Sequence, residues 1–270
     1  DALAHAHFDR LLDLTAAPPV AGQPAADLTI WPETAVPYLL EQAPGALREM
    51  SMAAENRAVI TGIQRTEGWR GWNSLAVLGP EGAVTAIYDK HHLVPFGEYI
   101  PFGDLVFRLT GIAAFAAQEG FGYTAGAGPA VLDLGPRLGR ALPLICYEAV
   151  FPGIARAAPG RADWILQITN DAWFGTLTGP WQHYAQARLR ATEQGLPLIR
   201  VANTGVTAVV DAHGRAVVAM GLGRRGFLDA RLPGALPPTP YARWGELPVI
   251  LVWLAGFAAL LVWRRRPARP

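Results

Sequence analysis

Residues 140–169 read RALPLICYEAVFPGIARAAPGRADWILQIT, and this stretch decides the fold class of the chain. Apolar runs at Arg140–Cys146 and Trp164–Thr169 predict two strands, and Pro152–Ala158 between them predicts a short helix that Pro159-Gly160 closes. A strand, a helix and a second strand in succession are typical of α/β proteins. The stretch therefore predicts a sheet with helices packed against it.

The same alternation continues on both sides of this stretch. Helices are expected at residues 2–14, 44–57 and 181–194, and strands at 27–31, 58–64, 74–78, 84–88, 198–202, 207–211 and 216–220. Turn residues at Gly79–Gly82 and at His213-Gly214 lie between adjacent strands and predict hairpins. Hairpins among α/β units indicate sheets that are not purely parallel.

Composition limits the function classes. The 270 residues are enough for one sizeable core, and 51% hydrophobic residues with 17% charged residues exclude a disordered chain. The formal net charge is +1, and no basic stretch interleaved with aromatic residues suggests nucleic acid as a partner. The single cysteine rules out an internal disulfide and is either a small buried side chain or a nucleophile.

The C-terminal region predicts a membrane helix. Leu247–Trp263 contains 17 residues without a charge, close to the lower limit for a bilayer crossing, and arginines follow directly. Pro233–Pro240 is rich in proline and marks a linker. We expect a globular domain over 1–232, a linker over 233–246, a transmembrane helix over 247–263 and a cytoplasmic basic tail over 264–270. A C-terminal helix buried in the globular core is the alternative.

Two further segments carry expectations. Tyr99–Pro129 fits no alternation of strands and helices, and it is interpreted either as an apolar lid or as an ordinary surface helix. The chain opens at Asp1 inside a predicted helix, so we expect an N-terminal part of the protein to be missing.

Three reactive side chains follow predicted strands. Glu33 comes after DLTIW and Pro32, Lys90 follows the strand at 84–88, and Cys146 ends the strand that opens at Arg140. Functional groups of α/β proteins often lie at strand ends, and the Cys146 junction resembles a nucleophile elbow. Considered alone, a glutamate at such a position is more commonly a solvated loop residue. His91 and His92 lack further ligands at useful spacing, so no metal is expected.

Four motifs in order carry a resemblance to a known family: WPE at 31–33, DKHHLVPFGEY at 89–99, CYE at 146–148 and TNDAWFG at 169–175. With them the chain resembles the nitrilase superfamily and, within it, the bacterial apolipoprotein N-acyltransferases. The resemblance implies an α-β-β-α sandwich with mixed sheets, here lacking its first strand, followed by a membrane helix.

The resemblance also implies roles for individual residues. Glu33, Lys90 and Cys146 would form the catalytic triad, with Glu33 as base, Lys90 at the oxyanion and Cys146 as nucleophile. Supporting roles and an acyl pocket are implied for a second group of residues. The supporting residues are Glu98, Tyr147 and Glu148, and the pocket residues are Trp173, Phe174 and Asn170.

The implied reaction is transfer of a fatty acyl chain from a phospholipid, through a Cys146 thioester, to the N-terminal amine of a diacylglyceryl-cysteine lipoprotein. It needs no cofactor. Both substrates lie in a membrane, and the implied location is the bacterial inner membrane with the catalytic domain on the periplasmic side. Two alternatives stay open: an amidase that hydrolyses a small amide with the same triad, and a membrane-anchored module without activity.

Overall fold

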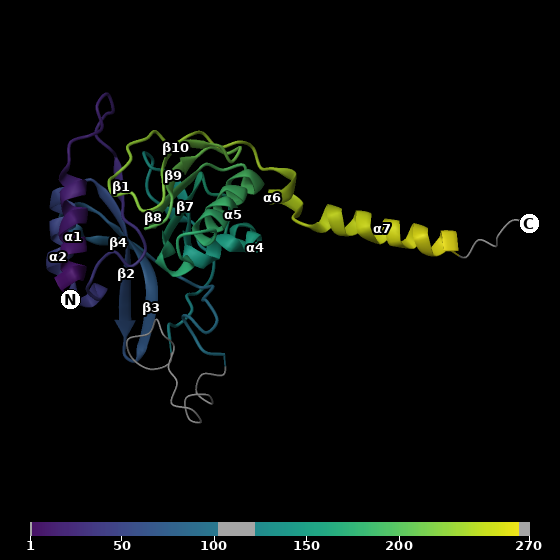
Figure 1. Ribbon diagram of the computed structural model, residues 1–270, viewed down its shortest axis with the longest axis horizontal. Coiled ribbons are helices and arrows are strands. Elements are labelled where there is room, and N and C mark those ends of the chain that lie inside the picture. The colour runs from purple at the N-terminus through teal and green to yellow at the C-terminus, as the bar shows by residue number, and fades with distance from the viewer. Residues whose placement is uncertain (1, 102–121, 265–270) are drawn as a thin grey trace, which may run out of the picture.

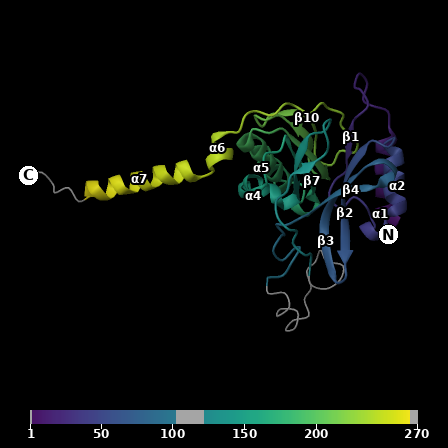
Figure 2. The ribbon, with the colours of Figure 1, turned by 180° about the vertical axis from the view of Figure 1, so that it is seen from behind.

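The structure is a computed structural model that describes residues 2–101 and 122–264. Two β-sheets lie face to face, and helices cover the outer face of each sheet (Figure 1). The layers are therefore helix, sheet, sheet and helix, as expected for the nitrilase fold, and the view from behind shows the same arrangement (Figure 2).

The first sheet has four strands in the order β1-β2-β3-β4. Its strand β1 pairs parallel with β2, whereas β2, β3 and β4 pair antiparallel. The elements of this half are α1 (Ala2–Ala16), β1 (Leu28–Ile30), η1 (Leu40–Gln42), α2 (Pro44–Ala53), β2 (Ala58–Glu67), β3 (Arg70–Leu78), η2 (Pro80–Gly82) and β4 (Val84–Asp89).

The second sheet has six strands in the order β10-β9-β8-β7-β6-β5. The central strands β6, β7 and β8 are parallel, and the outer pairs are antiparallel, so both sheets are mixed as predicted. Its elements are β5 (Leu132–Asp133), β6 (Arg140–Ile145), η3 (Cys146–Val150), α4 (Pro152–Ala157), β7 (Trp164–Asn170), η4 (Asp171–Phe174), α5 (Gly179–Gln194), β8 (Leu198–Asn203), β9 (Thr207–Val210) and β10 (Ala216–Met220).

Strand β6 shows how the sequence builds these layers. Successive side chains of a strand point to opposite faces of the sheet. Leu142 and Leu144 pack toward α5 with Ala187, whereas Ala141 and Ile145 face the first sheet. Because both faces of β6 are buried, its sequence is an unbroken apolar run. Because β6 is packed on both faces, its C-terminal end is held in place, and so is the cysteine that follows it.

The elements differ from the predicted ones mainly at their ends. Strand β3 begins at Arg70 rather than Ser74, and it pairs with β2 as far as Glu67. The two strands therefore form a hairpin, which the polar residues at its end did not predict. Helix α2 ends at Ala53 instead of residue 57, because Glu55 and Asn56 adopt left-handed backbone conformations that no α-helix continues.

The proline-rich linker is packed against the domain. It contains a short helix, α6 (Pro240–Trp244), that the sequence did not predict. Before it, the Leu236 amide donates to the Gly195 carbonyl over 2.9 Å. The hydroxyl of Thr239 caps α6 by accepting from the Ala242 amide at 3.0 Å.

The last helix, α7 (Leu247–Arg264), projects away from the two sheets (Figure 1). Its large apolar side chains are exposed, among them Leu251, Trp253 and Phe257. We predicted a membrane span over 247–263, but across the described residues no helix reaches the length and apolarity needed to cross a bilayer. The predicted span is therefore not confirmed.

Most of the predicted lid, residues 102–121 of Tyr99–Pro129, lies outside the described residues. The two flanks of that segment are joined to each other. Tyr99 forms an antiparallel bridge with Gly122, and the Tyr123 amide donates to the Glu98 carbonyl over 2.7 Å. Residues 98–99 and residues 122–123 are therefore held side by side by backbone hydrogen bonds.

Candidate active site

The structure brings Glu33, Lys90 and Cys146 together between the two sheets. Glu33 follows β1, Lys90 follows β4, and Cys146 follows β6, so two come from the first sheet and one from the second. The Lys90 Nζ lies 3.9 Å from Glu33 Oε1, and both charged groups interact electrostatically with the Cys146 thiol. All three side chains are buried. A carboxyl, an ammonium and a thiol thus share one small buried region.

Glu33 is held at both carboxylate oxygens. Oε1 accepts from Asn73 Nδ2 at 2.7 Å, and Oε2 accepts from the Asn170 amide at 2.7 Å. Burial raises the pKa of the Glu33 carboxyl above its ordinary value, although Lys90 and the Asn73 hydrogen bond oppose the rise. A carboxylate whose pKa is raised is a stronger base, which suits it to accept a proton near neutral pH.

Lys90 is an ammonium between carboxylates. Its Nζ donates to Glu98 Oε1 over 2.8 Å, while Glu33 lies farther away. Burial alone would lower the pKa of Lys90, but Glu33, Cys146 and Glu98 together outweigh burial and raise it. Lys90 therefore keeps its charge and can stabilise a developing oxyanion.

Cys146 is the first residue of η3 and directly follows β6. Its φ is 50°, a left-handed conformation that is uncommon for a residue with a side chain and that marks functional turns. Burial raises the pKa of the Cys146 thiol to about 12; Glu33 adds to the rise and Lys90 opposes it. The thiol therefore stays protonated at neutral pH and needs a base before it can attack.

Glu98, one of the predicted supporting residues, lies against this group. Its Oε1 accepts from both Lys90 and Asn73, the latter at 3.2 Å. Its Oε2 accepts from the Val94 amide at 2.8 Å, which fixes the turn after β4. Glu98 thus orients the Lys90 ammonium and the Asn73 amide at once.

Glu148, also predicted as a supporting residue, is held mainly by backbone amides. Its carboxylate accepts from the backbone amides of Ile145, His91 and His92 at 2.8, 2.9 and 3.1 Å. The Tyr88 hydroxyl lies 3.0 Å from the same carboxylate. Glu148 therefore ties the turn at the nucleophile to the segment after Lys90, and it acts on the site through the backbone.

The remaining predicted residues lie around the edge of the group. The Tyr147 ring packs against His92 and Phe151, with ring centres 5.9 and 4.9 Å apart. The backbone N–H of Asn170 donates to the Glu33 carboxylate. Trp173 is 62% exposed, and the Phe174 ring lies 5.0 Å from the His183 ring. The acyl pocket that these residues were predicted to line stays a prediction.

Several polar residues of the site were not singled out from the sequence. Asn73 joins Glu33 to Glu98 from the middle of β3. A second buried group lies next to Cys146, and no role was predicted for its members, although Asp171 belongs to the TNDAWFG motif: Gln167, Asp171, His183 and Arg200. One signal could have found two of them, because Asn73 and Gln167 interrupt apolar strands, and buried polar groups need partners.

Among the described residues, no three His, Cys, Asp or Glu side chains gather so as to hold a metal ion. His91, one of the adjacent histidines, instead contacts Glu148 and Tyr88, at 2.7 and 2.9 Å.

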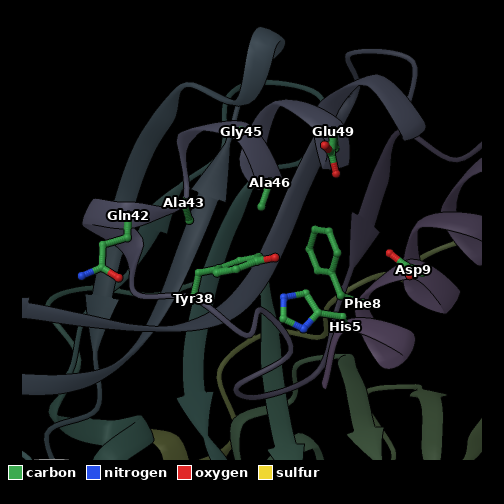
Figure 3. Close-up of a pocket in the computed structure, with 9 residues that line it drawn as sticks. All are labelled: His5, Phe8, Asp9, Tyr38, Gln42, Ala43, Gly45, Ala46 and Glu49. Carbon is green, nitrogen blue, oxygen red and sulfur yellow. The ribbon is translucent and has the colours of Figure 1, made fainter. Parts of the chain in front are cut away.

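A separate pocket lies on the outer side of the first sheet, where α1 meets α2 (Figure 3). Its volume is about 200 Å³, and the rings of His5, Phe8 and Tyr38 lie close together in it. It shares no residue with the group around Cys146, so we assign it no part in the chemistry of that group.

Known proteins resemble this chain in sequence and in structure. Residues 4–237 match the family described as carbon-nitrogen hydrolase. An apolipoprotein N-acyltransferase from Bradyrhizobium diazoefficiens is 45% identical over 96% of this chain and 49% of its own length, and one from Rhodopseudomonas palustris is 41% identical over 95% and 49%. The chain thus spans about half the length of the curated relatives that it matches.

Solved structures extend the comparison of the fold. A carbon-nitrogen hydrolase from Helicobacter pylori G27 has a TM-score of 0.61 at 17% identity, covering 81% of this chain and 80% of its own. An amidase of the nitrilase superfamily from Nesterenkonia AN1 has a TM-score of 0.60 at 18% identity, covering 93% and 91%. At such identities the likeness concerns the fold alone.

Proposed function

We propose, since the chain belongs to the carbon-nitrogen hydrolase family, that it is the catalytic part of an N-acyltransferase that works through a thioester on Cys146. The acyl donor is a phospholipid, and the acceptor is the N-terminal amine of a diacylglyceryl-cysteine lipoprotein. The names of the curated relatives support acyl transfer to lipoproteins.

One observation carries this proposal: a buried carboxyl lies 3.9 Å from a buried ammonium, and both act on a buried thiol. A thiol whose pKa is raised attacks poorly by itself, so the neighbouring base is a requirement of the chemistry. Glu33 supplies that base, and Lys90 supplies a positive charge for the oxyanion.

In the first half-reaction Glu33 takes the proton of the Cys146 thiol while sulfur attacks the ester carbonyl of the phospholipid. The new C–S bond makes a tetrahedral oxyanion, which Lys90 and the Tyr147 amide stabilise. The C–O bond to glycerol then breaks, and the leaving alkoxide takes the proton from Glu33. A lysophospholipid departs, and the acyl chain remains as a thioester.

In the second half-reaction the lipoprotein amine attacks the thioester carbonyl, and Glu33 accepts a proton from the nitrogen. The C–S bond breaks, the thiolate recovers the proton from Glu33, and an amide is released. The same base therefore serves both halves of a ping-pong reaction.

An amidase would use the same three residues, with water attacking the thioester in place of the amine. No observation at the site favours water as the acceptor, whereas relatives that are 40–45% identical carry the name of an N-acyltransferase. We therefore place acyl transfer first.

We further propose that the protein works at a membrane surface, because both substrates are lipids. Helix α7 supports contact with a membrane, since apolar side chains such as Val252, Leu254 and Leu260 are exposed along it. The location at the periplasmic face of the bacterial inner membrane stays a prediction.

The proposal is tested by the mass of the chain after incubation with phospholipid vesicles. One fatty acyl group should be added, and Cys146→Ser should lose that adduct because its hydroxyl is a weaker nucleophile than a thiol. An acyl group retained by the Cys146→Ser variant would contradict the thioester.

A matched pair of glutamate variants tests the base. Glu33→Gln should slow formation of the adduct by about a hundredfold or more, in line with the loss of a general base. Glu55→Gln changes an exposed glutamate that pairs with Arg57 at the surface, and the rate should stay the same. Equal rates in both variants would exclude Glu33 as the base.

A further inference from the structure

The backbone carbonyl of Cys146 contacts buried polar side chains. Two side-chain nitrogens lie within hydrogen-bond distance of its oxygen: His183 Nε2 at 3.0 Å and Gln167 Nε2 at 3.2 Å. His183 comes from α5 and Gln167 from β7. The catalytic steps above use neither residue.

His183 is itself held in place. Its Nδ1 lies 2.9 Å from Asp171 Oδ1, and Asp171 Oδ2 accepts from Arg200 Nη2 at 2.5 Å. The side chains of all three residues are at most 3% exposed. The Asp171 carboxylate is packed closely against Gly205, since a Cβ on that glycine would lie only 2.1 Å from Oδ2. With a proton on each ring nitrogen, His183 donates to Asp171 through Nδ1 and to the Cys146 carbonyl through Nε2, and the ring is then a fixed anchor for that carbonyl.

The carbonyl and the amide of one trans peptide unit point in opposite directions. The unit that contains the Cys146 carbonyl also contains the Tyr147 N–H, so an inward carbonyl turns that N–H outward. The Cys146 thiol belongs to the residue before this N–H, and Lys90 interacts electrostatically with that thiol, so the reacting carbonyl is bound next to this peptide unit. An N–H fixed there can donate to an oxyanion as it forms, without first reorganising.

We infer that His183 is a positioning residue for the oxyanion site: it holds the Cys146 carbonyl in the core and so aims the Tyr147 amide at the reacting carbonyl. The inference rests on the proposed acyl transfer through Cys146.

Two reactions of the same sulfur separate this role from plain structural support. Acetylation by p-nitrophenyl acetate passes through an oxyanion and releases nitrophenolate, whereas alkylation by iodoacetamide displaces iodide without any oxyanion. His183→Ala should slow acetylation by about tenfold to a hundredfold, because a misplaced donor should cost less than the roughly hundredfold to thousandfold loss that follows its removal. Its alkylation rate should stay within about twofold of the wild type, because that reaction needs no such donor.

Two variants complete the test. His183→Gln places an amide nitrogen near the position of Nε2, and it should recover part of the acetylation rate. Tyr184→Phe is the matched control, because its hydroxyl is buried in the described structure without a hydrogen-bond partner; neither reaction should change.

The inference is overturned if alkylation slows in parallel with acetylation in both His183 variants, because His183 would then support only the fold. It is also overturned if acetylation does not slow, or if the wild-type thiol accepts no acetyl group. A wild-type chain that is acetylated by the small ester but not by phospholipid would contradict the proposed lipid substrate, while the comparison of variants would still decide the role of His183.

Discussion

Glu33 is the residue whose surroundings decide how the site works. The carboxyl is buried, and its pKa is raised by that burial, against the opposing effects of Lys90 and Asn73. A base must be deprotonated to accept the thiol proton, so acylation is fast only above the pKa of Glu33. The pH dependence of the reaction therefore reports the environment of this one side chain.

We expect acetylation of Cys146 to slow as the pH falls, with a midpoint above 4.5, the ordinary value for a glutamate. The sign follows from burial, which favours the neutral carboxyl and moves its titration upward. The measurement is the rate of acetylation by p-nitrophenyl acetate between about pH 4 and pH 9, a range that spans the shifted carboxyl.

Asn73→Ala provides the second arm of this prediction. The Asn73 hydrogen bond lowers the pKa of Glu33, so its removal should move the midpoint to a higher pH. A midpoint at or below 4.5 in the wild type, or a downward movement in the Asn73 variant, would contradict the account of Glu33.

At the scale of the element, strand β2 holds in place the loop after β1 that contains Glu33. The Gly62 amide donates to the Pro32 carbonyl at 3.1 Å, and the Ala35 amide donates to the Gly62 carbonyl at 2.9 Å. A Cβ on Gly62 would lie 2.5 Å from the Cα of Glu33, closer than real contacts allow. The strand therefore needs a glycine at this position so that the loop can lie against it.

Gly62→Ala should displace that loop, because the clash is with backbone atoms that cannot rotate away. We expect unfolding to become easier by about 1–3 kcal/mol, as in other overpacked sites. Acetylation of Cys146 should slow by about tenfold or more, since a tenfold loss corresponds to only about 1.4 kcal/mol. Urea unfolding and the acetylation rate are the two measurements.

Gly45→Ala is the matched control for this prediction. Gly45 lies in the first turn of α2, and a Cβ there would meet nothing within 4 Å. Alanine is the better helix former, so stability should stay equal or rise slightly. If both glycine variants behave alike, close packing at Gly62 is not the reason for its glycine.

At the scale of the whole molecule, the two sheets assemble a site that neither could form alone. Glu33 and Lys90 belong to the first sheet and Cys146 to the second, and the apolar layer between the sheets holds these halves together. Helix α7 stands apart from this body (Figure 2). Its exposed apolar side chains suggest that it serves contact with lipid rather than the stability of the domain.

Removing residues 247–270 should therefore leave the thermal midpoint within about 2 °C of the full chain, because little buried surface is lost. Binding to phospholipid vesicles, measured by flotation, should fall sharply. The truncation keeps Glu246, which pairs with Arg156 at 3.2 Å.

A shorter chain that ends at residue 232 is the control for the truncation. It also loses the Leu236 amide, which donates to Gly195, and the Thr239 hydroxyl, which donates to the Glu193 carbonyl. Its midpoint should therefore fall. A large drop in the first truncation, or unchanged binding to vesicles, would show that α7 has another role.

The sequence by itself determined the order of most strands and helices and the mixed character of the sheets. It also determined the family, and the similarity to carbon-nitrogen hydrolases and to proteins named N-acyltransferases confirms it. The strands, helices and turns follow from local rules, because apolar periods of two and 3.6 residues and turn residues act over a few positions. The ends of β1, β4 and β6 were readable in the same way. The family followed from the resemblance that four motifs carry.

Only the tertiary structure decided which side chains meet. The partners of Glu148, the bridge that Asn73 makes, and the anchor of His183 on the Cys146 carbonyl join residues far apart in the chain. Such contacts depend on how two sheets and a helix pack, and no local pattern encodes that packing. The helix over 247–263 was plain in the sequence, whereas the short helix α6 before it, and the packing of the linker on the domain, emerged from the structure.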